Sequence, residues 1–518
     1  MTNLIFKIIK KKEAVIKTMR TLIKEGTVLL GTEYQPEKTD IYIEDNNIVR
    51  IGKNLDIEAD EVINAKDLLI TPGLVNAHLH SDENLFKAQF DNLPLELWML
   101  YTYPTLMYGP FSKRLIYLRT MLGAIEMVKH GVTLVQDDVS EYPKATLEGT
   151  DAVMEAYSDI GMRSSVTTNL CDKQWKDKLP YISDMLPQDI KEAYPPAAKK
   201  EELYELLENM IEKWHEPGGM TNVVLAPVAP QRCTDEFFQG MHRLGEKYDL
   251  PIHTHVLETK MQQVTGKEFY GTTLIEHMNN IGVLSDRTTI VHSVWLTDHD
   301  IELIAKAGAS VVHNPISNLK LGSGIMPYAK IKEAGINIAL GTDGMSSNDN
   351  QSIFEVMKIS ALLHKVTSPD YSKWPDAHDI YKAATFGGAK STRRNDHVGF
   401  ISENMRADLV FFDMNTAAFT PTNDLIKHLV YCENGDSIVR VMINGKTVVK
   451  DHEILTIDEK SLLRELSSMM DDFRKDYVKT KEWADKLFPY VDEVYWKSYR
   501  QSTGLNRLAG NEMRWIDI

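Results

Sequence analysis

The stretch Thr71–Ser81, TPGLVNAHLHS, ends a short apolar run with two histidines one residue apart. Side chains of an extended strand alternate between its two faces, so His78 and His80 point to the same side and can reach one metal ion. An H-x-H pair alone is equally compatible with packed or exposed histidines. The metal interpretation gains support from three further side chains, each of which follows its own strand-like run: His255, His292 and Asp343.

Strand-like and helix-like segments alternate through the middle of the chain. Apolar runs such as Val132–Asp138 and Thr288–Val294 are separated by helix-like stretches such as Arg114–His130, and the pattern gives about eight strand–helix repeats. That number closes a (β/α)8 barrel of the α/β class, with both faces of the sheet buried. Active sites of this fold lie at the carboxyl ends of the strands, which is where the histidines and Asp343 fall.

Strand patterns return at both ends of the chain. Leu22–Leu30 and Asp40–Ile51 lie near the start, and Ala407–Asp413 and Val439–Lys450 lie near the end. Neither pair could bury an apolar face alone, so we expect them to form one small β-sandwich domain. The expected organisation is therefore a leader with the first part of the sandwich (1–66), the barrel (67–400), the second part of the sandwich (401–454) and a helical C-terminal extension (455–518).

Composition narrows the class of protein. The formal net charge of −16 argues against a nucleic-acid partner or an anionic membrane surface. The 3 cysteines form no C-x-x-C pair, as is typical of a reducing compartment. No apolar run approaches the roughly 20 residues that cross a bilayer, and the basic start lacks the apolar core of a signal peptide. We therefore expect a cytoplasmic protein.

Five motifs in order, PGLVNAHLH, HTHVLE, IVHSVWL, HNPISNLKLGSGIMPY and LGTDG, resemble the amidohydrolase superfamily. The resemblance is strongest to its mononuclear-metal branch: guanine, methylthioadenosine/adenosylhomocysteine and cytosine deaminases, and triazine hydrolases. It extends from about Thr27 to Lys450 and so covers most of the chain.

The resemblance implies that His78, His80, His255 and Asp343 bind one divalent metal ion. Three imidazoles and a carboxylate suit Zn²⁺ best, with Fe²⁺ also possible. Spacing alone cannot choose between His253 and His255, which share a strand face. We favour His255 because it lies nearer the strand end and begins the family's H-x-x-E pattern.

The resemblance also implies three catalytic roles. Asp343 would accept a proton from the water that the metal activates. Glu258 would pass a proton to a ring nitrogen of the substrate and later to the leaving group. His292 would orient the nucleophile and stabilise the developing oxyanion.

Three residues are candidate substrate contacts, each with a plain structural alternative. Gln231 could bind a heterocyclic amide or cap a loop, and Trp98 could stack on a planar ring or anchor a loop. Asn318 would shape the loop beside the metal. Strand four, from Asn222 to Thr234, contains no Lys or Glu that could bridge two metals, which favours a single ion.

We therefore expect a metal-dependent hydrolase that deaminates a nitrogen heterocycle of the purine, pterin, pyrimidine or triazine type, releasing ammonia or a small amine. Hydrolytic dechlorination or cyclic amide hydrolysis at the same metal is the alternative, and a non-catalytic scaffold barrel is a remote one. The aromatic-rich extension 455–518 should cover the barrel or form a subunit contact, as in a homodimer.

Overall fold

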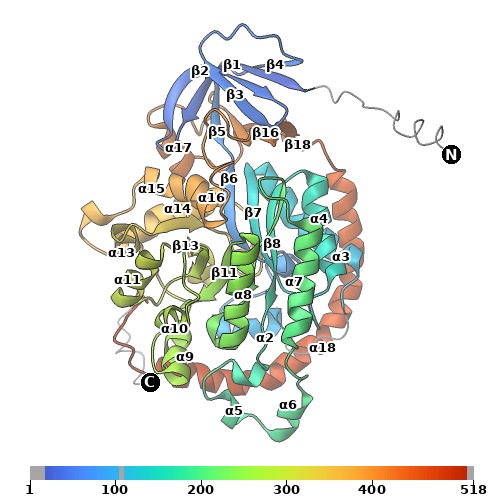
Figure 1. Ribbon diagram of the computed structural model, residues 1–518, viewed down its shortest axis with the longest axis vertical. Coiled ribbons are helices and arrows are strands. Elements are labelled where there is room, and N and C mark those ends of the chain that lie inside the picture. Colours follow the sequence, from blue (N-terminus) through green and yellow to red (C-terminus); the bar gives the residue numbers. More distant parts are fainter. Residues whose placement is uncertain (1–17, 104–109, 510–518) are drawn as a thin grey trace, which may run out of the picture.

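The structure, a computed structural model, describes residues 18–103 and 110–509. The expected basic leader falls within residues 1–17 and so lies outside the described residues. Figure 1 shows a sheet domain at one end of the molecule, a barrel below it, and a long helix that follows the side of the barrel. The predicted arrangement of a barrel, a β-domain from both chain ends and a helical extension is confirmed.

Parallel strands form the barrel in the order in which they follow one another along the chain. Strand four is split into two short pieces, β9 and β10, and both pair with strand three. The barrel strands are β6 (Leu74–Leu79), β7 (Val132–Val139), β8 (Arg163–Leu170), β9 (Thr221–Val223), β10 (Ala226–Pro227), β11 (Ile252–Val256), β12 (Thr288–His292), β13 (Ser310–His313) and β14 (Asn337–Leu340).

Two contacts close these strands into a ring. A parallel bridge between Leu225 and Ile252 joins the first half of the barrel to the second. On the other side, the backbone N–H of Asp343 donates to the carbonyl of His78 at 3.0 Å. Strand ends from distant parts of the sequence therefore meet at one mouth.

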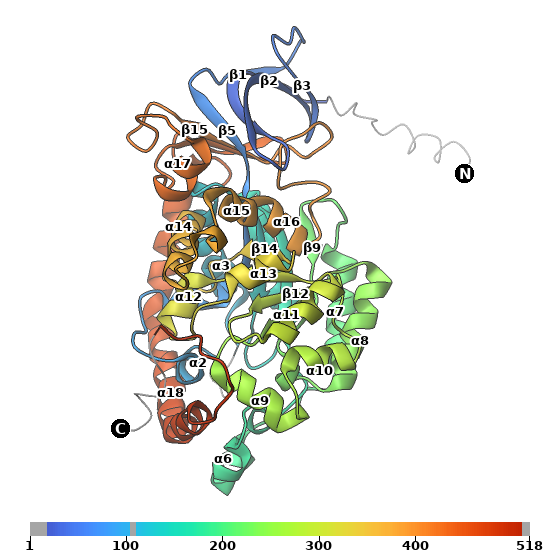
Figure 2. The same cartoon turned by 90° about the vertical axis from the view of Figure 1, so that its left-hand side faces the viewer.

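Helices cover the outside of the barrel (Figures 1 and 2). Local signals set their ends: α8 begins after Thr234, whose side chain accepts from the N–H of Phe237, and stops at the left-handed Asp249. The main covering helices are α3 (Lys113–Lys129), α4 (Leu147–Ile160), α7 (Lys200–Trp214), α8 (Asp235–Tyr248), α9 (Lys260–Tyr270), α10 (Leu274–Asn280), α11 (Asp298–Ala307), α13 (Tyr328–Glu333) and α14 (Ile353–Leu363).

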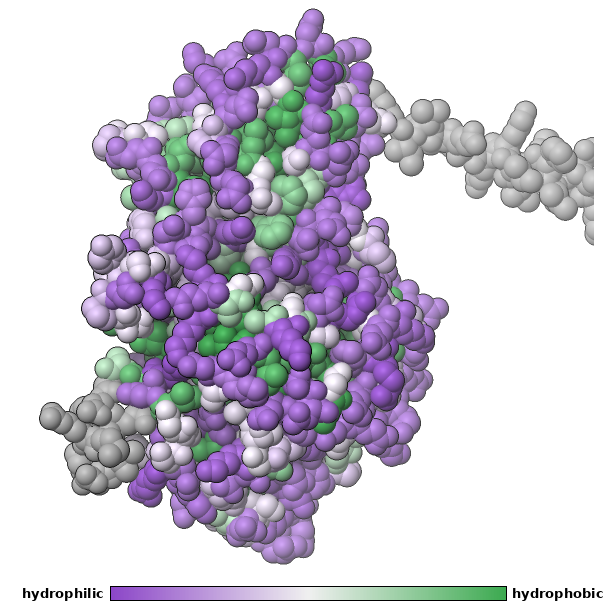
Figure 3. All heavy atoms as spheres, turned by 60° about the vertical axis from the view of Figure 1, so that its left-hand side comes forward, coloured by the Kyte–Doolittle hydropathy of each residue, from purple (hydrophilic) through white to green (hydrophobic). Residues whose placement is uncertain are grey.

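The two chain ends build one continuous sheet in the described part of the chain. Strand β5 lies between β1 and β15, so the early and late segments share hydrogen bonds. Figure 3 shows hydrophobic side chains gathered at this end of one face. The strands are β1 (Arg20–Leu30), β2 (Gln35–Glu44), β3 (Asn47–Gly52), β4 (Glu61–Asn64), β5 (Leu68–Pro72), β15 (Leu409–Asp413), β16 (Ile438–Ile443), β17 (Lys446–Lys450) and β18 (Glu453–Ile454).

The C-terminal extension is the long helix α18 (Glu459–Tyr499). It follows α3 and then passes beneath α9 and α2 (Leu95–Thr102), the helix after strand one (Figures 1 and 2). Its buried apolar side chains pack against α2 and against the insertion after strand three. The extension therefore covers the barrel of its own chain.

Candidate metal centre and active site

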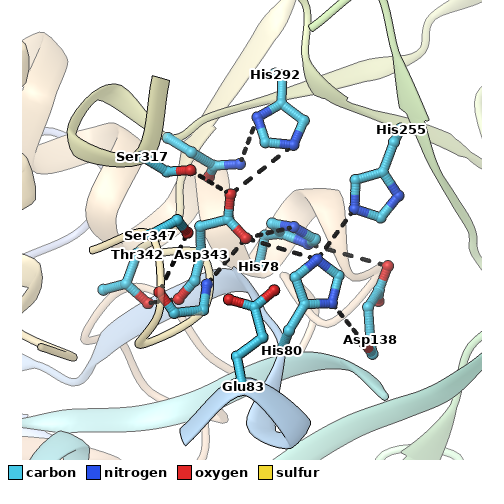
Figure 4. Close-up of polar contacts among 12 residues, drawn as sticks. His78, His80, Glu83, Asp138, His255, His292, Ser317, Thr342, Asp343 and Ser347 are labelled. Carbon is cyan, nitrogen blue, oxygen red and sulfur yellow. Dashed lines mark hydrogen bonds and ion pairs between the residues drawn. The ribbon is translucent and has the colours of Figure 1, made fainter. Parts of the chain in front are cut away.

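Four side chains from three barrel strands meet at the mouth of the barrel (Figure 4). His78 lies on β6, His80 directly follows it, His255 lies on β11, and Asp343 follows β14. Asp343 Oδ1 lies 3.5 Å from Nε2 of both His78 and His80, and Nε2 of His80 lies 3.2 Å from Nε2 of His255. The structure thus brings together the four residues that the sequence nominates as metal ligands.

Backbone carbonyls fix the orientation of two of these imidazoles. His80 Nδ1 lies 2.6 Å from the carbonyl of Asp138, and His255 Nδ1 lies 3.0 Å from the carbonyl of Val228. Because a carbonyl only accepts, Nδ1 carries a proton in both rings, and Nε2 is the atom with which each ring would bind a cation in place of a proton. His253, the alternative in the HTH motif, instead contacts His78, with 3.1 Å between its Nε2 and His78 Nδ1.

The donor set fits a divalent cation. Nε2 of His78 is buried and has no hydrogen-bond partner among the described residues. Burial lowers the pKa of His78 to about 3, which keeps this ring in the neutral form that ligates metals. Burial also disfavours the charged form of His80, but nearby carboxylates, chiefly Glu83 and Asp343, outweigh it and raise its pKa to about 10. The centre therefore attracts positive charge.

His292 and Glu258 face this cluster from the other side. The His292 Nε2 atom lies 3.4 Å from Glu258 Oε2 and 3.9 Å from Asp343 Oδ2. Burial, reinforced by Asp343 and Glu96, raises the pKa of Glu258 well above its ordinary value. Burial thus favours the protonated form of Glu258, which can donate a proton.

Asn318 holds His292 and does not line the pocket. Its Oδ1 lies 3.0 Å from Nδ1 of His292, while the Asn314 amide lies 3.4 Å from the same atom. Since the amide oxygen accepts, Nδ1 of His292 carries the proton, and Nε2 is an acceptor as long as the ring is neutral. Burial lowers the pKa of His292 and so favours that neutral ring.

Backbone strain marks the residues at the strand ends. Asp343 and His292 adopt positive φ angles of 66° and 71°, a conformation that costs about 1–3 kcal/mol in a non-glycine residue. Asp343 is held by two donors: Ser317 Oγ at 2.7 Å from Oδ2 and the Gly344 N–H at 2.9 Å from Oδ1. These contacts keep its carboxylate facing the histidines.

A pocket opens onto this cluster. Its wall includes Trp98, whose indole N–H has no partner among the described residues, together with Tyr103 and Arg232. A wider outer chamber adjoins it and is lined by Gln231 and by the insertion after strand three. Trp98 thus lies beside the centre, whereas Gln231 lies farther out.

A family model described as the amidohydrolase family matches residues 69–448. The chain belongs to this family.

Curated relatives of this amidohydrolase include several deaminases. It is 35% identical over 436 residues to the 5-methylthioadenosine/S-adenosylhomocysteine deaminase of Thermococcus sibiricus, covering 83% of this chain and 94% of that one. It is 32% identical to the 5′-deoxyadenosine deaminase of Methanosarcina barkeri, with coverage of 88% and 95%. The expected enzyme class, a hydrolase acting on C–N bonds other than peptide bonds, is confirmed.

Solved structures show the same architecture. An adenosine deaminase from Xanthomonas campestris with bound zinc matches with a TM-score of 0.78 and 26% identity, covering 88% of this chain and 99% of that one. The atrazine chlorohydrolase of Arthrobacter aurescens, complexed with zinc, has a TM-score of 0.80 at 24% identity, covering 87% and 100%, which supports the fold alone. Within the described residues, no helix of this amidohydrolase is long and apolar enough to cross a membrane.

The pocket also contains polar residues that sequence reasoning did not identify. Glu83, Tyr103 and Arg232 line it beside the predicted residues. None of them lies at the end of a barrel strand. The one available signal was the position of Glu83, three residues after the H-x-H pair.

Proposed function

We propose that this amidohydrolase removes the exocyclic amino group from the adenine base of a 5′-modified adenosine and releases ammonia. The relatives named as methylthioadenosine/adenosylhomocysteine and 5′-deoxyadenosine deaminases cover more than 80% of the chain and support this substrate class. The proposed reaction type, release of ammonia, rests on one observation. The buried Glu258 carboxyl lies 3.4 Å from His292 and faces the candidate metal ligands, where it can supply a proton.

We propose one divalent ion, Zn²⁺, held by His78, His80, His255 and Asp343. When bound, such a cation supplies Lewis-acid activation of water. The three imidazoles and the carboxylate match the ligand preference of Zn²⁺, and the bound zinc of the Xanthomonas campestris structure supports the same choice.

Glu258 starts the reaction by donating its proton to the ring nitrogen next to the carbon that carries the amine. Protonation makes that carbon electrophilic and so lowers the barrier to attack by water. Asp343 accepts one proton of the attacking water. As the carbonyl forms, the Glu258 carboxylate takes the remaining proton of that water from the new hydroxyl group and passes it to the departing amine, which leaves as ammonia. The proton held by Asp343 then returns to Glu258, so both carboxyl groups regain their starting states.

His292 orients the water in this mechanism. Its expected stabilisation of the oxyanion stays a prediction. The contact of its Nδ1 with Asn318 Oδ1 supports a neutral ring protonated at Nδ1, whose Nε2 can accept a hydrogen bond. Neutral Nε2, 3.9 Å from Asp343 Oδ2, accepts a hydrogen bond from the same water that Asp343 deprotonates. The two side chains thereby align one lone pair of the water toward the substrate.

A panel assay tests the substrate class. The zinc-loaded full chain is mixed with 5-methylthioadenosine, S-adenosylhomocysteine, 5′-deoxyadenosine, guanine, a pterin and a chlorotriazine, and ammonia and chloride are measured. We expect one equivalent of ammonia per adenosine derivative and an absorbance change at the purine ring. Chloride from the triazine, or ammonia only from the other bases, would contradict the proposal.

A further inference from the structure

Glu83 is a buried carboxyl that the four-ligand centre does not use. It lies on the 3-10 turn Ser81–Phe86 that directly follows β6, and its side chain is fully buried. No Lys or Arg forms an ion pair with it in the ranges 18–103 and 110–509. In the structure the compensating charge comes from the nearby His80, whose pKa Glu83 helps to raise. A bound cation would supply that charge in its place.

Three parts of the chain are shaped around this carboxyl. The Tyr103 hydroxyl donates to Oε1, and the Ser346 hydroxyl donates to Oε2 at 2.5 Å. A Cβ atom at Gly344 would lie 1.9 Å from Oε2, so only glycine leaves room for the carboxyl at this point. The position of Glu83 is therefore fixed by contacts that are distant in sequence.

The carboxyl faces the candidate metal centre (Figure 4). Ligand atoms of Glu83, His80 and Asp343 all lie within 4.8 Å of one another. Asp343 also links this group to His78, whose buried Nε2 lies 3.5 Å from Asp343 Oδ1. Two of the four proposed ligands, His80 and Asp343, therefore lie beside Glu83, and a cation bound by these three residues would meet two carboxylates.

We infer that Glu83 is a further protein ligand of the divalent ion, which makes the centre electrically neutral. Asp343 alone would leave a divalent ion with one uncompensated positive charge in a buried site, and a second carboxylate removes that charge. The inference rests on the divalent ion of the proposed function but on no particular substrate.

Metal affinity tests this inference without reference to activity. The full chain is stripped of metal, and Zn²⁺ affinity is measured by competition with a chromophoric chelator for the wild type and for Glu83→Gln. We expect Glu83→Gln to raise the Zn²⁺ dissociation constant at least tenfold. The visible spectrum of the Co²⁺-loaded variant should also differ from that of the wild type, because one ligand is lost.

Glu96→Gln is the matched control. Glu96 is another buried carboxyl near the pocket, it accepts from Thr259 Oγ1 at 2.5 Å, and it does not belong to the ligand cluster. Its variant should change the dissociation constant less than twofold and leave the Co²⁺ spectrum unchanged. If Glu83→Gln fails to fold by circular dichroism, Tyr103→Phe and Ser346→Ala replace it, each expected to weaken Zn²⁺ binding about threefold by releasing the carboxylate.

The outcomes separate this inference from the proposed function. Equal Zn²⁺ affinity and equal Co²⁺ spectra for Glu83→Gln and Glu96→Gln would overturn it. If Glu83→Gln raised KM while both variants bound Zn²⁺ equally, Glu83 would contact the substrate and not the ion, and the inference would still be overturned. Weakened metal binding together with no ammonia from any adenosine derivative would support the inference and reject the proposed substrate.

Discussion

Proton transfer depends on a few atoms around Glu258. Burial favours a neutral ring at the neighbouring His292, whose Nδ1 contacts Asn318, and Glu258 lies 3.4 Å from Nε2 of that ring as a carboxyl that can transfer a proton. Ser323 Oγ lies 3.4 Å from Glu258 Oε1 and helps to hold the side chain. The contribution of this one carboxyl to turnover should therefore exceed that of any polar side chain on the pocket wall outside the proposed metal ligands and His292.

Glu258→Gln should lower kcat for ammonia release by about 10²–10⁴-fold, the usual range for loss of a general acid. The amide keeps the shape of the side chain but cannot transfer a proton, so zinc content by atomic emission should stay near the wild-type value. Glu202→Gln, at the rim of the outer chamber, is the control and should retain kcat within a factor of two. If Glu258→Gln turned over at the wild-type rate, Glu258 would not be the proton donor of the reaction.

Most of the site residues that the sequence predicted lie at strand ends, whereas most site residues elsewhere were missed. His78, His80, His255, His292 and Asp343 follow apolar runs, and the barrel places such residues at one mouth. Glu83 lies on a turn with no side-chain period, and its partner Ser346 is 263 residues away. Asn318 was identified, but only the structure shows that it holds His292.

At the scale of elements, α18 supports α2, which forms part of the wall of the pocket at the barrel mouth. Its Leu487, Val491 and Val494 pack against Leu97 and Leu100 of α2, the helix that carries Trp98. The sequence predicted a helical cover from its aromatic content but could not say which elements it covers. By contrast, α9 was not predicted because its buried side chains include polar ones and no apolar stripe marks it.

Leu487→Ala should cost about 2–5 kcal/mol of unfolding free energy, because it leaves a cavity between α18 and α2. Leu487 is 1% exposed, whereas Val478 on the same helix is 54% exposed. Val478→Ala is therefore the control, with an expected change within about 0.5 kcal/mol. Denaturant titrations followed by circular dichroism compare the two, and equal midpoints would show that α18 is not stabilised by this contact.

At the scale of the molecule, buried neutral histidines make stability depend on pH. His364, after α14, lies against His313 at the end of β13, with 3.0 Å between their Nε2 atoms. Burial lowers the pKa of His364 from 6.5 to about 4. The unfolded chain therefore binds a proton more readily, and stability falls as the pH drops from about 6.5 to 4.

Between pH 6.5 and pH 4 the wild type should lose roughly 3 kcal/mol more unfolding free energy than His364→Gln, because glutamine has no proton to bind in the unfolded chain. Thermal unfolding midpoints at pH 7 and pH 4.5 measure the difference. His299→Gln, at an exposed position, should follow the wild type. Parallel curves for all three proteins would show that the His313–His364 contact has no part in acid sensitivity.

The sheet domain has a consequence for synthesis on the ribosome. Strand β5 has β1 on one edge and β15 on the other, and β15 begins only at Leu409. While the barrel is being translated, one edge of β5 has no partner, and such edges readily pair with other chains. A nascent chain halted before residue 409 should therefore need chaperone protection even after its barrel has been made.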